Sequence, residues 1–180
     1  PFLQKEGASK KMKGYRMASA QHFELVDLSM PVLADDEVLV RILVCGVCAS
    51  EYHSWENGKE IGKVFGHEGV GIVEKIGAKV TEFQPGDRVT GMMFQAFAEY
   101  TKVPAAHIVK VPEGLTDEEA VGEPLACMMS GVLRTPLNPG DAFAIVGTGY
   151  MGLGFMQMMR AKGAVTVIAV DVREEGLANA

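Results

Sequence analysis

Residues 142–152 are Ala-Phe-Ala-Ile-Val-Gly-Thr-Gly-Tyr-Met-Gly, an apolar run that ends in three closely spaced glycines. Helix-forming residues continue to about Lys162, Gly163 provides a stop, and a second apolar run occupies residues 165–170. This order predicts a strand, a tight turn, a helix and a second strand. A β-α-β unit of this kind requires its two strands to lie parallel in one sheet.

The glycine turn has the spacing of a dinucleotide-binding loop. Gly147 permits the tight turn, Gly149 lets the backbone approach a pyrophosphate, and Gly152 lets helix and strand pack closely. Asp171 follows the second strand, nineteen residues after the last glycine, where an acid accepts ribose hydroxyls and disfavours a 2′-phosphate. We therefore predict NAD in preference to NADP, a preference that Arg173 softens. The predicted cofactor contacts are Gly147, Gly149, Tyr150, Met151, Gly152, Asp171 and Arg173.

A further helix is predicted before this unit. Thr116-Asp-Glu-Glu119 has the pattern of a capping box, in which the Thr hydroxyl and the Glu119 carboxylate satisfy free backbone N–H groups. It leads into residues 120–134, which we predict to be helical, and residues 136–140 break the helix with proline and glycine.

The preceding part of the chain is dominated by short strands. The β-rich runs are residues 37–46, 69–76, 87–90, 98–103 and 107–111. Glycine and proline separate them, and short strands with frequent turn signals predict a closed or strongly curved β architecture.

Composition restricts the classes of function. Of 180 residues, 48% are hydrophobic, and the formal net charge of −6 is spread without long like-sign runs, so we expect neither nucleic acid nor a membrane as partner. The longest apolar stretches fall far short of the ~20 residues that a bilayer span needs, and no secretory signal opens the sequence. Three cysteines do not make a disulfide framework. We expect a cytoplasmic protein.

Candidate metal ligands occur in two short segments. Cys48 begins Cys-Ala-Ser-Glu-Tyr-His, and His67 and Glu68 lie in Gly-His-Glu-Gly, the histidine nineteen residues after the cysteine. A thiolate, an imidazole and carboxylates are the ligands that zinc prefers, and a catalytic zinc uses three protein ligands with one position open. Taken singly, each of these residues is ambiguous, because a lone cysteine beside a strand more often fills the core and a lone histidine more often has a core or surface role.

Five motifs, in this order along the chain, resemble the medium-chain dehydrogenase/reductase family. They are Gly46-Val-Cys-Ala-Ser-Glu-Tyr-His53, Gly66-His-Glu-Gly-Val-Gly71, Pro85-Gly-Asp-Arg-Val89, Gly122-Glu-Pro-Leu-Ala126 and the Gly147 turn. The resemblance is greatest to the zinc-dependent branch that contains alcohol, sorbitol and threonine dehydrogenases, and it extends over about residues 12–180.

The resemblance implies an α/β fold with a β-rich part. Residues 12–138 would form a GroES-like β-barrel catalytic domain, residues 139–180 the first β-α-β unit of a Rossmann doubly wound domain, and residues 1–11 a tail or expression remnant. One such unit supplies two strands, whereas a doubly wound domain has about six. We therefore expect the Rossmann domain to be truncated here, and the full-length protein to be a homodimer or homotetramer.

Carried over position by position, the resemblance implies Cys48 and His67 as zinc ligands. Glu68 matches a glutamate that binds the metal directly or exchanges with water, and Glu123 matches an acid that approaches it directly or through water. Cys127 is the rival of Glu123, because residues four apart share one face of a helix. Alignment of the following Ser-Gly favours Glu123.

Ser50 and His53, which both follow Cys48, match the proton relay of the family. Ser50 matches the hydroxyl that takes the substrate proton, and His53 matches its partner in passing that proton to solvent; with Glu68 they are the predicted catalytic residues. Glu51 stands where the family usually has aspartate, and this longer acid would orient His67 or meet a distant arginine.

The structural-zinc lobe of the family is missing from its usual place after Val89. Residues 90–100 contain no cysteine, so we expect one catalytic zinc per chain and no structural zinc. Cys45 is assigned to the core, His22 and His107 to structural or surface roles, and the methionine groups to packing.

These features predict a zinc-dependent oxidoreductase that transfers a hydride between a secondary alcohol or polyol and NAD, with zinc as Lewis acid. The Glu-Pro-Leu motif favours polyols, amino alcohols or cyclic sugars. Two alternatives stay open: a zinc-free quinone or enone reductase that uses NADPH, which Cys48, His67 and Asp171 oppose, and a non-catalytic relative that kept the fold.

Overall fold

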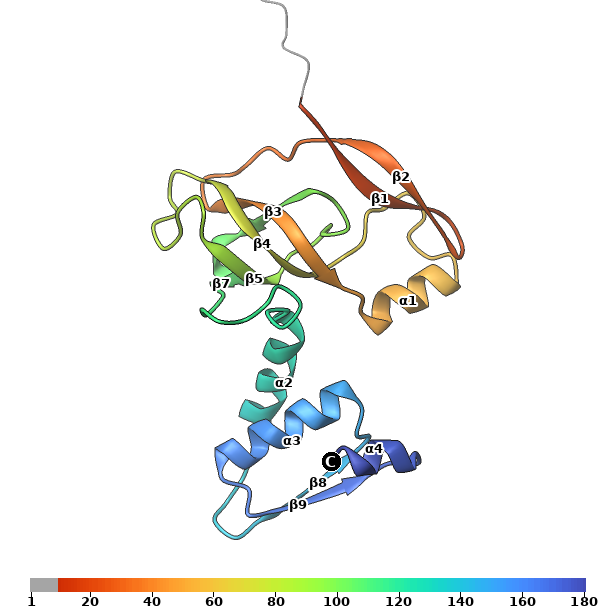
Figure 1. Ribbon diagram of the computed structural model, residues 1–180, viewed down its shortest axis with the longest axis vertical. Helices are drawn as coiled ribbons and strands as arrows, with labels where there is room; N and C mark the ends of the chain where they lie inside the picture. The colour runs from red at the N-terminus through yellow and green to blue at the C-terminus, as the bar shows by residue number, and fades with distance from the viewer. Residues whose placement is uncertain (1–9) are drawn as a thin grey trace, which may run out of the picture. The chain divides into compact units, whose positions relative to one another are not determined.

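The computed structural model describes residues 10–180 (Figure 1). Its strands are β1 (Lys11–Ser19), β2 (His22–Ser29), β3 (Glu37–Gly46), β4 (Glu68–Ile76), β5 (Arg88–Met92), β6 (Tyr100–Pro104), β7 (Ile108–Lys110), β8 (Ala142–Val146) and β9 (Thr166–Val170). Its helices are α1 (Ala49–Glu56), the 3₁₀-helix Ala105–His107, α2 (Glu123–Arg134), α3 (Tyr150–Lys162) and α4 (Glu174–Ala178). The chain divides into two compact units, of which the first ends at Glu123 and the second runs from Pro124 to Ala180.

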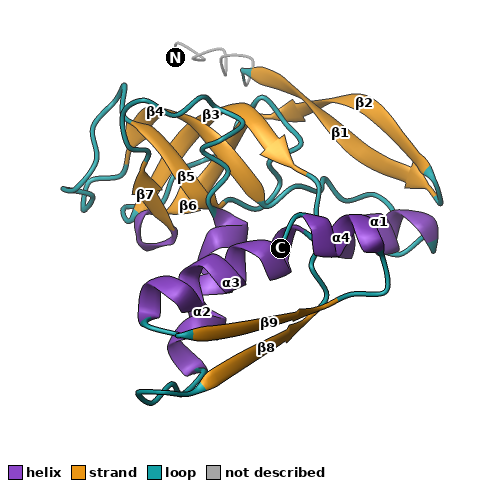
Figure 2. Cartoon of the chain, turned by 60° about the horizontal axis from the view of Figure 1, so that its bottom comes forward, coloured by secondary structure: helices purple, strands orange, loops and turns teal. Residues whose placement is uncertain are grey.

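The first unit is built on a five-stranded antiparallel sheet in the order β6-β3-β4-β5-β7. Its central strands are rich in valine and isoleucine, which pack well on a pleated surface. The register between β3 and β4 shifts at Leu39/Val40 and again at Ile42/Val44. Such bulges bend a strand and increase its twist, and Figure 2 shows a strongly twisted sheet. The predicted curved β architecture is therefore confirmed.

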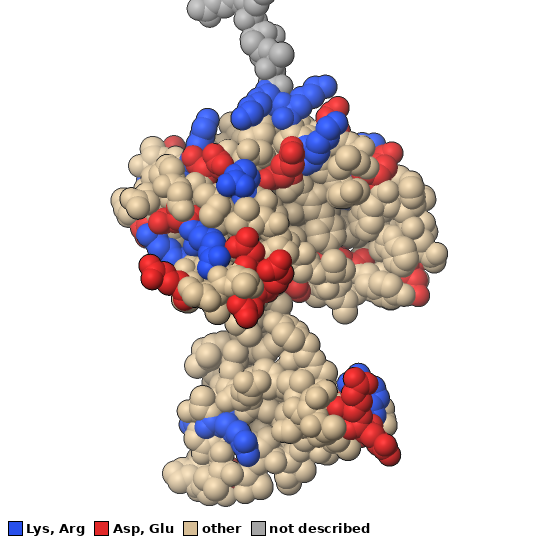
Figure 3. Space-filling view, viewed as in Figure 1, with Lys and Arg blue, Asp and Glu red and all other residues tan. Residues whose placement is uncertain are grey.

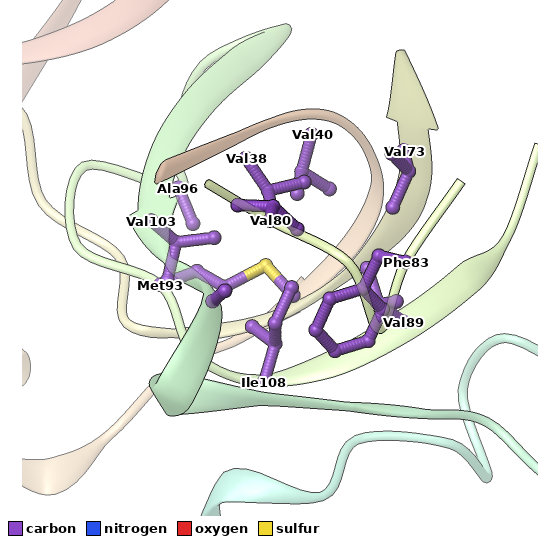
Figure 4. Packing of buried hydrophobic residues seen from close by; sticks show 11 residues of the cluster. Val38, Val40, Val73, Val80, Phe83, Val89, Met93, Ala96, Val103 and Ile108 are labelled. Carbon is purple, nitrogen blue, oxygen red and sulfur yellow. The ribbon is translucent and has the colours of Figure 1, made fainter. Parts of the chain in front are cut away.

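The core of this unit lies on one side of the sheet, where alternate residues of several strands converge. Its buried members are Val38, Val40, Val73, Val80, Phe83, Val89, Met93, Ala96, Val103, Ala105 and Ile108. Figure 4 shows the Met93 thioether in the middle of the valine and isoleucine side chains. Cys45 packs against this cluster, in line with its predicted core role.

A β-hairpin formed by β1 and β2 precedes the sheet, and neither strand was predicted from the sequence. Both strands mix polar and apolar residues, and they pair antiparallel from Lys11 to Ser29. Isolated bridges from Gly14 to Ala98 and from Arg16 to Val64 join the hairpin to the rest of the unit. Of the predicted tail, residues 1–9 lie outside the described residues, and Lys11 already belongs to β1.

The second unit contains the predicted β-α-β arrangement. Strands β8 and β9 pair in parallel from Ala142/Thr166 to Val146/Val170. Helix α3 ends at Gly163, whose φ of 116° is the left-handed geometry that suits glycine at a helix end. Phe143 and Phe155 stack with ring centroids 5.7 Å apart in the small core between helix and strands.

The predicted helix over residues 120–134 begins later than expected. The capping box does form, with the Thr116 N–H donating to Glu119 Oε2 (2.9 Å) and the Glu119 N–H donating to Thr116 Oγ1 (3.2 Å), but it closes a turn. The helix itself starts at Glu123. Pro124 explains the difference: proline lacks an N–H and disfavours helical geometry in the residue before it, so it is accommodated only in the first turn of a new helix.

Charged side chains of both signs are interspersed on the face of the first unit that Figure 3 shows. Several of them form ion pairs, among them Lys13–Asp27 (2.7 Å), Arg16–Glu24 (2.6 Å) and Arg41–Glu74 (2.9 Å). All of these side chains remain at least 40% exposed, so solvent screens the pairs and they contribute little to stability.

Two adjacent methionines test the position of the core. Met93 is fully buried (0% exposed), whereas Met92 is 38% exposed. We expect Met93→Ala to lower the free energy of unfolding by about 2–5 kcal/mol, because it leaves a cavity in the sheet's core. Met92→Ala, the matched control, should change it by less than about 0.5 kcal/mol. Urea denaturation measures both, and equal losses would contradict this packing.

Candidate metal centre, substrate pocket and cofactor turn

The pairing of β3 with β4 brings together two segments that are distant in the sequence. Gly46, the last residue of β3, pairs with Glu68, the first residue of β4. Cys48 follows β3 as the N-cap of α1, and His67 directly precedes β4. The two predicted ligands therefore lie at the same end of one strand pair.

Three of the predicted ligands converge. The donor atoms of Cys48, His67 and Glu68 all lie within 4.8 Å of one another. Cys48 and His67 are half-buried, Glu68 is buried, and the Cys48 thiol donates a hydrogen bond to the Glu68 carboxylate. Burial raises the pKa of Glu68, while the neighbouring His67 opposes this shift. A thiol, an imidazole and a carboxylate in a partly buried position match the donor set of a catalytic zinc site.

Glu51 holds the imidazole of His67 in place. Its Oε1 lies 3.0 Å from His67 Nδ1 and accepts the backbone N–H of Gly66 at 2.7 Å, while its Oε2 accepts the backbone N–H of Cys48 at 3.0 Å. Glu51 is itself buried, with 8% of its surface exposed. Of the two roles predicted for this acid, the structure has the one that orients His67. With Nδ1 bound to the carboxylate, Nε2 is the ring nitrogen left for a metal.

Gly46 provides the space for the Glu68 carboxylate. A Cβ atom at position 46 would overlap Oε2 of Glu68, so only glycine allows the carboxylate to lie across this strand end. Gly46 belongs to one of the sequence motifs, but the motif indicates no role for it. Its contact with Glu68 follows from the strand register, which the sequence does not display.

Glu123 lies near enough to this cluster for its charge to act on Glu68. It is buried (6% exposed) at the start of α2, and its charge contributes to raising the pKa of Glu68. Among the described residues, the group of donor atoms within 4.8 Å comprises Cys48, His67 and Glu68. Cys127, the rival ligand, is exposed one helical turn after Glu123. The choice between the two stays a prediction.

Ser50 and His53 both lie on α1 and are exposed. Ser50 lines a pocket together with His67. His53 lies one turn later, where its Nδ1 is 3.2 Å from the Asn57 amide nitrogen. The same amide donates to the His53 carbonyl at 2.9 Å, which fixes the amide beside the ring.

The pocket beside His67 has a volume of about 330 Å³, at the small end of the range for small-molecule sites. Its lining includes Ser50 and Ser54 from α1, Glu60 and Lys63 from the loop before β4, and Phe94 and Gln95 after β5. The last four residues lie between the recognisable motifs and were not predicted from the sequence.

The glycine turn adopts the geometry that its spacing predicts. Gly147 has a φ of 97°, and Gly149 is the N-cap of α3. A Cβ at Gly152 would overlap the carbonyl oxygen of Gly147, so the third glycine is required for close packing. Tyr150 and Met151 are exposed in the first turn of α3.

Asp171 joins the glycine turn to the end of β9. Its Oδ2 accepts the Thr148 N–H (2.7 Å) and the Thr148 hydroxyl (2.8 Å), and its Oδ1 lies 3.2 Å from Arg173 Nε. The Arg173 guanidinium and the Thr148 N–H hold the pKa of Asp171 well below its usual range. Gly176 of α4 packs on this cluster, since a Cβ there would lie 2.6 Å from Thr148 Oγ1. The carboxylate is therefore ionised and already engaged within the protein.

Known proteins share both the sequence motifs and the fold. Residues 34–113 match the GroES-like domain of alcohol dehydrogenases. The chain is 29% identical to sorbitol dehydrogenase of Bacillus subtilis, over 89% of this chain and 56% of that protein. It is 31% identical to an alcohol dehydrogenase of Geobacillus stearothermophilus, over 86% of this chain and 56% of that protein. This chain belongs to the medium-chain dehydrogenase/reductase family, in its zinc-type alcohol and polyol branch.

A solved member of this family supports the same assignment of the fold. A candidate zinc-binding dehydrogenase from Sinorhizobium meliloti, bound to NADP, has a TM-score of 0.79 and 27% identity, and the match covers 93% of this chain and 58% of that one. The chain thus spans little more than half the length of the relatives it matches. None of the helices in residues 10–180 has the length and apolar character needed to span a bilayer.

The reactivity of the Cys45 thiol tests whether the interior beside the Cys48, His67 and Glu68 group is buried as the structure has it. Burial raises its pKa from 9.0 to about 12. Since alkylation requires the thiolate, we expect iodoacetamide to modify Cys45 in the folded protein far more slowly than the exposed Cys127 at pH 8, and the difference to shrink only as the pH approaches 12. Mass spectrometry of digested protein measures both sites. Equal rates in the folded state, as expected in urea, would contradict the structure.

Proposed function

We propose that this chain carries the zinc-binding catalytic part, and the first cofactor-binding unit, of an oxidoreductase that transfers a hydride between a secondary alcohol or polyol and NAD. The convergence of Cys48, His67 and Glu68 carries this proposal. The relatives named as sorbitol and alcohol dehydrogenases support the reaction class. A neutral alcohol is a small molecule, which suits the size of the pocket beside His67.

One zinc ion would be held by Cys48 and His67, with Glu68 and Glu123 as further ligands or water-mediated contacts. Residues 90–100, where the resemblance places the structural-zinc lobe, contain no cysteine, which supports a single catalytic zinc in this part of the protein. When bound, zinc would supply a Lewis acid for the substrate oxygen, and NAD would accept the hydride.

The residues of the chain would bind the substrate and move its proton. Ser50, on the pocket wall, would accept a hydrogen bond from the substrate hydroxyl and take its proton, and the exposed His53 would pass that proton to solvent. Glu51 keeps the imidazole of His67 in one orientation throughout.

We propose NAD as the preferred cofactor. The ionised carboxylate of Asp171 at the end of β9 would repel a 2′-phosphate, and Gly147 and Gly149 would let the backbone approach the pyrophosphate. Arg173 beside Asp171 reduces the strength of this preference, because its guanidinium offsets the negative charge.

Metal analysis combined with an alcohol panel tests the function. We expect the full-length protein to hold one zinc per chain and to form NADH from secondary alcohols or polyols. Cys48→Ser and His67→Ala should lose the zinc and slow NADH formation by about 10³-fold, because a Lewis acid contributes several kcal/mol to the barrier. Full activity after removal of zinc by a chelator would refute the proposal.

The same assay decides between the two candidates on α2. We expect Glu123→Gln to weaken zinc binding and Cys127→Ser to leave it unchanged, as measured by competition with a metal-binding dye. The reverse order of effects would make Cys127 the ligand.

Glu51 offers a separate test through zinc affinity alone. Glu51→Gln keeps the length of the side chain but removes the charge that orients His67 and raises its basicity, so we expect zinc to bind about 10–100-fold more weakly. Glu56→Gln is the matched control, because Glu56 is exposed on the same helix. An unchanged zinc affinity in Glu51→Gln would mean that the hydrogen bond to His67 has no role in metal binding.

A further inference from the structure

Part of the lining of the pocket beside His67 is polar. Glu60, Lys63 and Gln95 belong to this part, together with Ser54 of α1, whereas Phe65 and Phe94 are apolar. A pocket for a simple apolar alcohol requires only apolar contacts beyond the reacting carbon, so these polar residues provide hydrogen-bonding groups that such a substrate would leave unpaired.

Two of these residues have a backbone geometry that side chains disfavour. Glu60 and Gln95 both have a φ of 62°, and only one other non-glycine residue in the described part of the chain, Gln21, has a positive φ. Left-handed geometry favours glycine, and long side chains rarely adopt it. Both glutamate and glutamine therefore occupy positions where glycine would be less strained, and both line the same pocket. Strain of this kind is a mark of functional sites.

The charges around the pocket favour a neutral ligand. Lys63 Nζ lies 2.6 Å from Glu60 Oε1, so the one lysine or arginine among the described lining residues is already paired with an acid. The buried carboxylate of Glu51 adds a further negative charge. In the lining beyond the metal position the two acids Glu51 and Glu60 outnumber Lys63, so a phosphorylated or carboxylated group placed there would meet net negative charge, whereas hydroxyl groups can donate to Glu60 and accept from Lys63.

We propose that Gln95, together with the Glu60–Lys63 pair, makes this pocket specific for neutral polyhydroxylated substrates by binding hydroxyl groups beyond the reacting carbon. This inference rests on the proposed function and adds the substrate class and the residues that select it. Lys63 and Glu60 are 66% and 48% exposed, so their ion pair is loosely held and can exchange partners with substrate hydroxyls.

The substitution Gln95→Gly separates selectivity from stability, because it removes the amide and relieves the backbone. We expect kcat/KM for sorbitol to fall about tenfold in the full-length zinc-loaded enzyme, mainly through a higher KM, as the loss of one hydrogen bond predicts. The kcat/KM for 2-butanol, which has no second hydroxyl, should fall far less than that for sorbitol, and the thermal midpoint should stay equal or rise.

Gln21→Gly is the matched control. Gln21 has a φ of 60° in the turn between β1 and β2 and is not among the residues that line the pocket. It should tolerate glycine in the same way and leave the ratio of sorbitol to 2-butanol activity unchanged. Lys63→Met should lower sorbitol kcat/KM as Gln95→Gly does, without raising activity on sorbitol 6-phosphate.

Ligand-observed NMR with sorbitol and the zinc-loaded protein provides a readout that is independent of turnover. Weaker sorbitol binding in Gln95→Gly supports the proposal even if the wild type oxidises no alcohol or polyol of the panel, a result that would overturn the proposed function alone. Equal loss on sorbitol and 2-butanol, no loss on either, or a wild-type preference for sorbitol 6-phosphate would overturn the pocket assignment while leaving the alcohol dehydrogenase function intact.

Discussion

The pairing of Gly46 with Glu68 across β3 and β4 determines the geometry of the donor group formed by Cys48, His67 and Glu68. Side chains alternate across a strand, so a shift of one residue in this register would turn Glu68 to the opposite face and carry Cys48 and His67 apart. The hydrophobic core prevents such a shift, because Val38, Val40 and Val73 on the two strands are buried together. The position of the ligands is thus a consequence of the same burial that folds the sheet. Any metal then binds to a site whose donor atoms already converge.

The sequence was sufficient where structure depends on neighbours along the chain. Strand β8, the glycine turn, α3 and its stop at Gly163 were predicted almost residue for residue, because strand periodicity and glycine geometry are local properties. The predicted start of α2 was wrong. The chain offers two local signals for a helix start, the capping box at Thr116 and the proline at position 124, and only one of them can begin the helix. The hairpin of β1 and β2 was not named, because its strands are partly exposed and lack a continuous apolar run.

The candidate site shows the same division. Cys48, His67 and Glu68 were identified from motifs, and the structure brings their donor atoms together. The pocket wall was missed, because Glu60 and Gln95 belong to no motif and a positive φ in a long side chain leaves no trace in the sequence. Contacts that depend on strand register, such as that of Gly46 with Glu68, are invisible for the same reason. Sequence patterns predicted the chemistry, and tertiary structure added the residues that shape the space around it.

Asp171 combines a structural and a chemical role at the cofactor turn. Its side chain is only 5% exposed and accepts two hydrogen bonds from Thr148, so these contacts fix the turn whether or not a cofactor is bound. Arg173, by contrast, is 61% exposed and is held by a solvent-screened ion pair. A ribose that approaches the carboxylate would therefore displace Arg173 and leave Thr148 in place. The arginine would then lie beside the ribose, where its position relative to the 2′ oxygen, together with the charge of Asp171, would affect the choice between NAD and NADP.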